Sequence, residues 1–367
     1  MSLSFSYPDV SKHPSFDNHE TVLKAEDSDI GFKAFIAVHN STMGPARGGC
    51  RYWSRYQNES EAINDVLKLS KGMTYKTALA NLEYGGGKTV IVGPEGTTNP
   101  APEIMISLGH ALNELKGIYE TGEDVGTRTD DFKIAGTVTD YVRIRSVENA
   151  GAQDLPGGPP LYTAHGVLSG IKAAVKHKFQ KDDLKDIRIA VKGLGNVASP
   201  LCEFLYRQGA VLTVADIDPA KVEYAQENWN AKTVSPDEIM FQDVDVYTPC
   251  ALGGDINMET FGQIKARVIA GAANNQLADA SMADALHNNG ILYAPDYGIN
   301  AGGVINVVLV GAGHEEVLAR VQAIGATLAE IFERSEAQNL NTTLVADMIV
   351  QERLQKKSQG YQTAIAV

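Results

Sequence analysis

The sequence predicts an α/β protein of two domains, and three observations support this fold class. The 367 residues, 44% of them hydrophobic, suffice for about two domain cores. Helical and strand-like segments alternate beyond residue 160, as in βαβ units around a parallel sheet. Residues 147–160 are rich in Gly and Pro and lack periodicity, which is typical of a linker. We therefore expect one domain over residues 1–146 and another over 147–334.

The first half of the chain is expected to mix strands and helices. Residues 31–53 have the pattern of short strands interrupted by Gly and Pro. Asn58 or Ser60 can cap the helix that follows. Residues 82–93 are expected to form a Gly-rich bend running into a β-branched strand, and residues 103–115 have helical spacing.

The second half alternates more regularly. The expected helices and strands cover, in chain order, residues 163–179, 187–196, 199–209, 211–218, 244–252, 267–275 and 290–300. Residues 315–340 and 342–357 have the amphipathic spacing of helices.

Composition excludes several classes of protein. A formal net charge of -13 argues against binding nucleic acid, which requires clustered Lys and Arg. No apolar run is long enough for a membrane span and no export signal is recognisable, so we expect a soluble cytoplasmic protein. The three cysteines, Cys50, Cys202 and Cys250, include no CxxC pair, so neither a disulfide framework nor a metal site is expected.

A dinucleotide site is indicated near residue 193. Gly193, Gly195 and Ala198 form a G-x-G-x-x-A pattern between a strand-like run and a helix, where glycines let the backbone approach a pyrophosphate. Asp216 ends the next strand, 21 residues after Gly195, where an acid can hold a ribose 2′-hydroxyl and repel a 2′-phosphate. The pattern favours a Rossmann domain that binds NAD. An ordinary Gly-containing turn, or another nucleotide enzyme, remains open on this motif alone.

Two lysines, Lys76 and Lys88, stand 12 residues apart, the second directly after Gly85, Gly86 and Gly87. A phosphate-binding loop would need a glycine where Leu82 stands, so an ATPase is disfavoured. A lysine in a confined glycine-lined site would have its charged form disfavoured, which makes Lys88 a candidate base. The alternative is that both lysines are solvated surface groups.

Nine motifs resemble the Glu/Leu/Phe/Val dehydrogenase superfamily, above all its leucine, valine and phenylalanine enzymes. They occur in the family's order over roughly residues 30–310: GPARGGCRYW, LSKGMTYKTA, YGGGKTVI, TGEDVGT, PLYTAHGV, KGLGNVA, TPCALGG, AGAANNQL and APDYGINAGGVINV. The resemblance implies an NAD-dependent L-amino-acid dehydrogenase. Its N-terminal α/β domain would serve substrate binding and oligomerisation, its Rossmann domain would bind NAD, and a cleft would separate them. C-terminal helices over 335–367 would pack back on the first domain, and the chain would form a homo-oligomer.

The resemblance also assigns the reacting groups. Lys76 would bind the substrate α-carboxylate, and Lys88 would activate the water that attacks the iminium carbon. Asp124 would exchange protons with the amino group. Asn275 would also hold the carboxylate, although turn formation is the commoner role of such an Asn. The cofactor would be contacted by Gly193, Gly195, Asn196, Val197, Asp216, Ile217, Thr163, Cys250, Ala251, Ala273 and Asn274.

The substrate side-chain pocket is implied to comprise Met43, Gly44, Arg47, Gly122, Val304 and Val307. The valines favour a branched-chain or other apolar substrate. Arg47 departs from the leucine enzymes, and an acidic or polar substrate side chain could pair with it. Alternatively Arg47 turns outward or pairs with Glu123. Because Gly122 enlarges the pocket, an aromatic substrate is a further alternative.

Two other classes of Rossmann protein compete with this interpretation. An NAD-sensing regulator would keep the glycine motif but would not need Lys76, Lys88 and Asp124 together. A hydroxy-acid dehydrogenase would be expected to use a His and Arg pair, which the eight histidines do not suggest, and His165 is expected to be structural.

Overall fold

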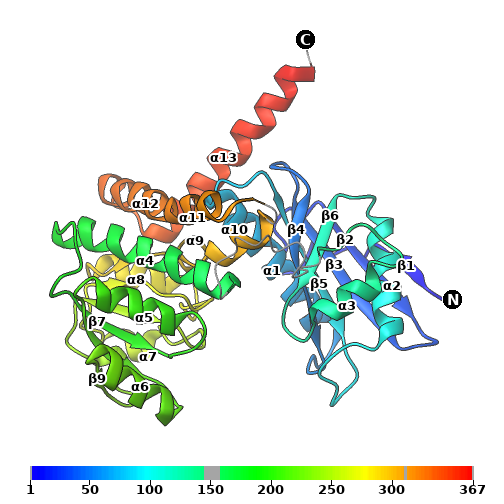
Figure 1. Ribbon diagram of the computed structural model, residues 1–367. Coiled ribbons are helices and arrows are strands. Elements are labelled where there is room, and N and C mark those ends of the chain that lie inside the picture. Colours follow the sequence, from blue (N-terminus) through cyan, green and yellow to red (C-terminus); the bar gives the residue numbers. More distant parts are fainter. Residues whose placement is uncertain (1, 144–157, 310–311, 366–367) are drawn as a thin grey trace. The chain divides into compact units, whose positions relative to one another are not determined.

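The computed structural model describes residues 2–143, 158–309 and 312–365 of the chain. Contacts divide the protein into two compact units, one comprising Met1–Ala150 with Glu352–Val367 and the other Gly151–Gln351. Each unit contains one sheet with helices packed on it (Figure 1), which confirms the predicted α/β class with two domains.

The sheet of the first unit has six strands in the order β1-β2-β3-β5-β4-β6. Their bounds are Ser4–Ser6, Thr21–Asp27, Phe32–Asn40, Ala46–Trp53, Gly85–Val92 and Tyr119–Glu123 for β1 to β6. The pairs β1/β2, β2/β3 and β3/β5 are antiparallel, whereas β4 lies parallel to both β5 and β6. The chain thus places β4 between two strands that come later in the sequence.

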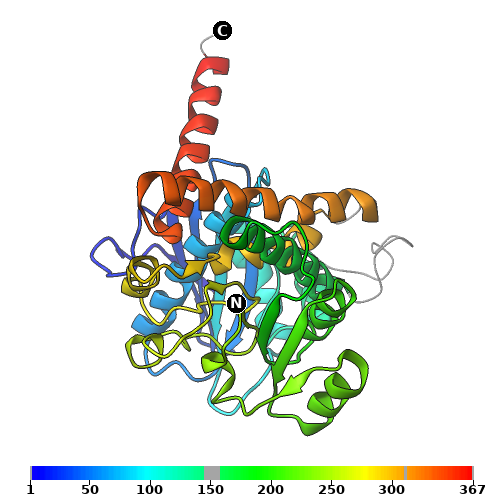
Figure 2. The same cartoon turned by 90° about the vertical axis from the view of Figure 1, so that its left-hand side faces the viewer.

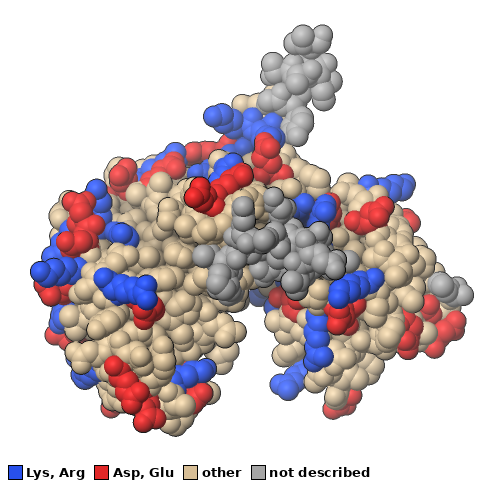
Figure 3. Space-filling view, in the orientation of Figure 1, with Lys and Arg blue, Asp and Glu red and all other residues tan. Residues whose placement is uncertain are grey.

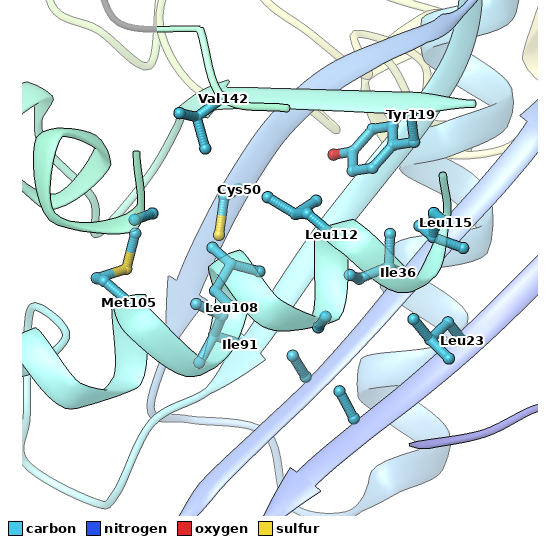
Figure 4. Packing of buried hydrophobic residues seen from close by; sticks show 14 of the residues in the cluster. Leu23, Ile36, Cys50, Ile91, Met105, Leu108, Leu112, Leu115, Tyr119 and Val142 are labelled. Carbon is cyan, nitrogen blue, oxygen red and sulfur yellow. The ribbon is translucent and has the colours of Figure 1, made fainter. Parts of the chain in front are cut away.

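Helices cover both faces of this sheet. On one face lies α1 (Glu59–Leu79), whose Val66 and Leu67 pack against Phe35 and Val90. On the other face lie α2 (Pro102–Glu114) and α3 (Thr129–Ala135). Figure 4 shows the core beneath α2, where its leucines point toward side chains of the sheet such as Ile36 and Ile91. Burying these apolar side chains fixes which face each strand residue projects from.

The second unit contains a six-stranded parallel sheet in the order β12-β11-β10-β7-β8-β9. The bounds of β7 to β12 are Arg188–Lys192, Val211–Ala215, Lys232–Thr233, Val246–Pro249, Val268–Ile269 and Leu292–Tyr293. This is the strand order of a Rossmann fold, and it reverses between β7 and β10. Ligands of such sheets bind at that reversal, beyond the carboxyl ends of the strands.

Helices surround the second sheet. They are α4 (Gly158–Phe179), α5 (Ala198–Arg207), α6 (Pro219–Trp229), the 3-10 turn η1 (Ile239–Phe241), α7 (Met258–Phe261), α8 (Ser281–Asn288), α9 (Asp296–Ile299), α10 (Gly302–Val308), α11 (His314–Gln322), α12 (Ile324–Gln338) and α13 (Thr342–Ile365). Figures 1 and 2 both show α12, in orange, lying against α4, in green. The residues of α13 from Glu352 onward belong to the first unit.

Several local predictions can be compared with this structure. The Asn58 cap is confirmed, since its side chain accepts a hydrogen bond from the Glu61 amide. The predicted bend at Gly85–Gly87 is wrong, because these glycines lie inside β5. Most of the expected linker 147–160 lies outside the described residues, but its last three belong to α4. Prolines are tolerated in the first turn of a helix, where their missing N–H has no intrahelical partner.

The surface shows no concentration of one sign of charge on the face in Figure 3, where acidic and basic side chains are interspersed over each unit. Among the described residues no helix is long and apolar enough to cross a membrane. Within the same ranges, no three His, Cys, Asp or Glu residues lie together as metal ligands would.

Candidate active site

Alternate residues of β4, β5 and β6 project from the sheet face that α1 covers. Cys50 is paired in register with both Thr89 and Glu123, and its side chain lies in the core beneath α2. Because side chains alternate between faces, positions one or three residues away from these three project toward α1. They form one continuous group of sites: Arg47, Gly49, Arg51, Gly86, Lys88, Glu120, Gly122 and, just beyond β6, Asp124.

The glycines of β5 let its neighbours approach closely. A Cβ at Gly86 would overlap the backbone of Thr74 in α1, and one at Gly87 would lie 2.5 Å from the Tyr119 ring. The helix therefore meets the strand at the point where side chains are absent. Lys76 follows Thr74 by two residues and Lys88 follows Gly86 by two, so this close packing fixes the segments that carry both lysines.

Lys88 and Asp124 form a close ion pair. Lys88 Nζ lies 2.6 Å from Asp124 Oδ2, with the lysine side chain 8% exposed and the aspartate side chain 26% exposed. Burial alone would raise the pKa of Asp124, but Lys88 and Arg51 outweigh this effect and hold its pKa below the usual value. A basic side chain and an ionised carboxylate thus lie in contact on the glycine-lined face.

Arg51 is a charged residue at this site that sequence reasoning missed. Its Nη1 lies 2.8 Å from Asp65 Oδ2 in α1, and its Nε lies 3.7 Å from Asp124 Oδ2. Tyr56 donates a hydrogen bond of 2.5 Å to the same Asp65 oxygen. A sequence signal could have found Arg51, because it stands two residues after Gly49 in the GGCR motif. If this motif is recognised as a strand, Arg51 projects from the same face of the sheet as Lys88.

Arg47 finds its partner inside the first unit. Its Nε lies 2.9 Å from Glu120 Oε2, and its guanidinium lies 3.6 Å from the centre of the Tyr84 ring. Arg143 pairs with the same carboxylate. The suggested outward orientation and the pairing with Glu123 are both wrong, because Arg47 is only 12% exposed and the register places Glu120 directly beside it.

The other expected pocket residues of the first unit differ in accessibility. Met43 is buried, whereas Gly122 is partly exposed and lies beside Gly49 in the register of β4 and β6. Gly44 has a φ of +145°, and a Cβ there would overlap the Glu83 carbonyl. Gly44 is therefore required by the backbone itself, independently of any substrate.

In the second unit, the expected cofactor residues gather at the carboxyl ends of four parallel strands. Gly193, Gly195, Asn196 and Val197 follow β7, Asp216 and Ile217 follow β8, Cys250 and Ala251 follow β10, and Ala273 and Asn274 follow β11, with the expected substrate residue Asn275 next to them. In a parallel sheet these ends meet at one edge, and β7 and β10 flank the reversal of strand order.

The loop after β7 has the geometry of a phosphate cradle. Gly193 has a φ of +92°, and its N–H donates a 2.7 Å hydrogen bond to the Ala215 carbonyl. A Cβ at Gly195 would meet no atom within 4 Å, so that glycine faces open space. The loop leads into the N-terminus of α5 at Ala198, where the positive end of the helix dipole favours an anion.

Asp216 is held in a defined position beside this loop. One carboxylate oxygen accepts a 2.6 Å hydrogen bond from the Leu194 amide, and the other accepts one of 2.8 Å from the Asp218 amide. The adjacent Ile217 is 91% exposed, which is unusual for an isoleucine. A fixed carboxylate and an apolar surface thus lie side by side at the end of β8.

The asparagines after β11 have structural roles of their own. Asn275 adopts a left-handed conformation, with a φ of +52°, and its backbone N–H donates to Asp296. Asn274 accepts a 2.8 Å hydrogen bond from Asn300. Both side chains belong to exposed residues, so their turn geometry and a ligand contact are compatible.

Thr163 and the two valines lie on helices of the second unit. The Thr163 hydroxyl donates to the Pro159 carbonyl at 2.9 Å. Val304 and Val307 are one helical turn apart on α10, and Val307 is 43% exposed whereas its neighbour Val308 is buried. The valines therefore form an accessible apolar face of α10.

The cysteines offer no reactive thiol. Cys50 and Cys202 are fully buried, and burial raises the pKa of both thiols. Burial likewise raises the pKa of Cys250 to about 12. His165 stacks on Phe204 with ring centres 4.4 Å apart, in agreement with a structural role.

Comparisons with known proteins assign both parts of the chain to one family. Residues 19–141 match the model of the Glu/Leu/Phe/Val dehydrogenase dimerisation domain, and residues 217–334 match that of glutamate/leucine/phenylalanine/valine dehydrogenase. Leucine dehydrogenase of Bacillus subtilis is 45% identical over 92% of both chains. L-tryptophan dehydrogenase of Nostoc punctiforme is 41% identical over 95% of this chain and 97% of its own. The crystal structure of the Nostoc punctiforme enzyme superposes with a TM-score of 0.83 at 39% identity, covering 93% and 97% of the two chains.

Proposed function

This chain belongs to the Glu/Leu/Phe/Val dehydrogenase family, and we propose that it oxidatively deaminates an apolar L-amino acid with NAD. An L-amino acid, water and NAD⁺ would give a 2-oxo acid, ammonium, NADH and a proton, and the reverse reaction would aminate the oxo acid. The observation that carries this proposal is the ion pair between buried Lys88 and partly exposed Asp124.

The proposed roles follow the chemistry of that pair. Lys76 binds the substrate carboxylate, with Asn275 as a second ligand. Lys88 in its neutral form takes a proton from the water that attacks the iminium carbon, and Asp124 exchanges protons with the leaving or entering amine. The 2.6 Å between Lys88 Nζ and Asp124 Oδ2 supports this division, because it places the base and the carboxylate at one reacting centre.

The second unit has the features that NAD requires. The open cradle at Gly195 suits the pyrophosphate, the fixed Asp216 carboxylate suits a ribose 2′-hydroxyl, and exposed Ile217 can cover the adenine. When bound, the nicotinamide supplies the hydride acceptor. Since the Asp216 carboxylate would repel a 2′-phosphate, we propose NAD rather than NADP. Asn196, Val197, Thr163, Cys250, Ala251, Ala273 and Asn274 complete the proposed contacts.

The proposed substrate has a branched-chain or other apolar side chain. Glu120 already pairs with Arg47, and burial of Glu120 is offset by Arg143 and Arg47, which hold the pKa of Glu120 below its usual value. An acidic substrate side chain would have to displace that carboxylate, which argues against a glutamate-like specificity. Accessible Val304 and Val307 support an apolar side chain. An aromatic substrate is the second candidate, because Gly122 carries no side chain on the face of the sheet where Lys88 and Asp124 pair.

The organisation of the chain follows the same proposal. We assign the first unit, Met1–Ala150 with Glu352–Val367, to substrate binding and oligomerisation, and the second unit, Gly151–Gln351, to NAD binding; residues 335–351, expected in the first domain, lie in the second unit. The dimerisation-domain description of the model that matches residues 19–141 supports a homo-oligomer.

A substrate panel tests the proposed function. NADH oxidation would be measured with 4-methyl-2-oxopentanoate, phenylpyruvate, indolepyruvate and 2-oxoglutarate, each with and without ammonium. We expect activity only with ammonium and the highest kcat/KM with 4-methyl-2-oxopentanoate. Oxidation without ammonium would indicate a hydroxy-acid enzyme, and a preference for 2-oxoglutarate would contradict the interpretation of Arg47.

A further inference from the structure

Arg51 lies between two carboxylates on the α1 face of β4. Its Nη1 pairs with Asp65 at 2.8 Å, and its Nε faces Asp124 at 3.7 Å, with the arginine side chain 25% exposed. Arg51 Nε is buried and has no hydrogen-bond partner among the residues that the structure describes. The oxygen that it faces is the same Oδ2 that contacts Lys88.

At 3.7 Å, Arg51 Nε and Asp124 Oδ2 are too far apart to form a hydrogen bond. Buried N–H groups are nearly always paired, so an unpaired Arg51 Nε a few tenths of an ångström beyond bonding distance is exceptional. A small rotation of the Asp124 carboxylate away from Lys88 would complete that bond. The anchor on the other side is firm, because Asp65 also accepts the Tyr56 hydroxyl.

We propose that Arg51 is a positioning residue for Asp124. Arg51 Nε donates a hydrogen bond to Asp124 Oδ2 whenever Lys88 turns to the substrate, and the guanidinium charge keeps the carboxylate ionised. The inference rests on the proposed roles of Lys88 and Asp124 and adds a third member to them. Lys88 cannot remain paired with Asp124 at every stage of a reaction in which it acts as a base. At those stages Arg51 is the cation that still faces the carboxylate.

The charges around Asp124 make this role measurable. Burial raises the pKa of Asp124, and Lys88 and Arg51 lower it below the usual value. Cys50 and Tyr119, from the opposite face of the sheet, contribute no charge near neutral pH because burial raises the pKa of each. Loss of the Arg51 charge should therefore raise the pKa of Asp124, and the acidic limb of the pH profile should move to higher pH.

The test compares pH profiles of kcat/KM for reductive amination. Arg51→Met and Arg51→Gln both remove the charge, and the glutamine amide can still donate to Asp65, which protects the fold. We expect the acidic limb to move up by roughly 1 pH unit in both variants. Arg51→Lys should keep the limb near its original position while kcat falls several-fold. Arg55→Met is the matched control, because Arg55 is an exposed arginine four residues after Arg51. The acidic limb of its kcat/KM profile should not move.

Two results would overturn the proposal. The limb could stay in place in a folded Arg51→Gln variant while kcat fell equally at every pH, which is the signature of a purely structural arginine. Alternatively Arg55→Met could shift the limb as far as Arg51→Gln does.

A second readout separates this inference from the proposed function. A double-mutant cycle of Arg51→Gln and Asp124→Asn, read by chemical unfolding, needs no substrate. We expect a coupling free energy between Arg51 and Asp124 at pH 7, and we expect it to vanish as Asp124 becomes protonated at low pH. Absence of coupling at pH 7 would refute the role of Arg51 whatever the chain catalyses, whereas coupling in a chain without ammonium-dependent activity would refute only the proposed function.

Discussion

Gly49 and Asp124 compete for the same space: a Cβ on Gly49 would lie 2.7 Å from the Cβ of Asp124. The glycine on β4 thus makes room for the carboxylate that follows β6. We predict that Gly49→Ala displaces Asp124 from Lys88 and lowers kcat by roughly 100-fold, because a misplacement of about 1 Å can cost that much. Steady-state kinetics would measure it. The control is Gly72→Ala in α1, where an added Cβ would meet no atom within 4 Å, and it should leave kcat unchanged. Equal activity of the two variants would show that the Asp124 position is unimportant.

The C-terminal helix should stabilise the helix that carries Lys76. Arg353 Nη1 donates to the carbonyls of Ala78 and Leu79, at 2.7 and 2.9 Å, where the last turn of α1 lacks intrahelical partners. We predict that Arg353→Ala destabilises the protein by about 1–3 kcal/mol and raises the KM for the 2-oxo acid. Thermal unfolding and initial rates would measure these effects. The control Lys357→Ala removes an exposed ion pair from the same helix and should change neither stability nor KM appreciably. A KM unaffected by Arg353→Ala would show that α13 does not influence substrate binding at Lys76.

The reactive side chains of the site could be predicted from the sequence, but the ion-pair partners of its two arginines could not. Lys88 follows three consecutive glycines and Asp216 ends the strand after a glycine motif, so local sequence patterns singled out both residues. Arg47 and Arg51 depend on strands joined out of chain order, since β4 pairs with both β5 and β6. Their partners Glu120 and Asp124 lie more than 70 residues away, and no local pattern predicts that register. The Gly85–Gly87 error has a related cause, because glycines that admit a neighbouring helix look the same in sequence as glycines that make a bend.

A buried histidine pair should make the first unit sensitive to acid. Burial and the neighbouring His19 lower the pKa of His39 to about 4, and its Nδ1 lies 2.9 Å from the Thr74 hydroxyl in α1. Because the pKa of the folded state lies below that of the unfolded state, near 6.5, this contribution is complete above pH 6.5 and is lost as the pH falls toward 4. We predict a loss of roughly 3 kcal/mol over that window. Urea unfolding at several pH values would measure it.

The control for this prediction is a matched pair of variants. His39→Gln should flatten the pH dependence of the unfolding free energy, whereas His13→Gln, outside the buried pair, should leave its slope as in the parent. An unchanged slope in a folded His39→Gln variant would show that other groups cause the acid sensitivity.

Asp216 should determine which dinucleotide is preferred. Replacing it with Asn keeps one acceptor oxygen, for either the Leu194 or the Asp218 amide, and removes the charge that would repel a 2′-phosphate. We predict that the ratio of kcat/KM for NADH to that for NADPH falls by roughly 10-fold or more, as expected when about 1.4 kcal/mol of repulsion is lost. Asp218→Asn, which alters the cap of α6, should leave the ratio nearly unchanged. A parent chain that prefers NADPH would refute this account of Asp216.

The proposed reaction depends on the ε-amine of Lys88 as the base. The most direct measurement is the kcat of Lys88→Met with ammonium, NADH and the preferred 2-oxo acid at saturation. Methionine fills the same volume without a basic group. We predict that kcat falls at least ~1000-fold while the Kd for NADH stays within about twofold. Turnover near the parent rate in a folded variant would contradict the account.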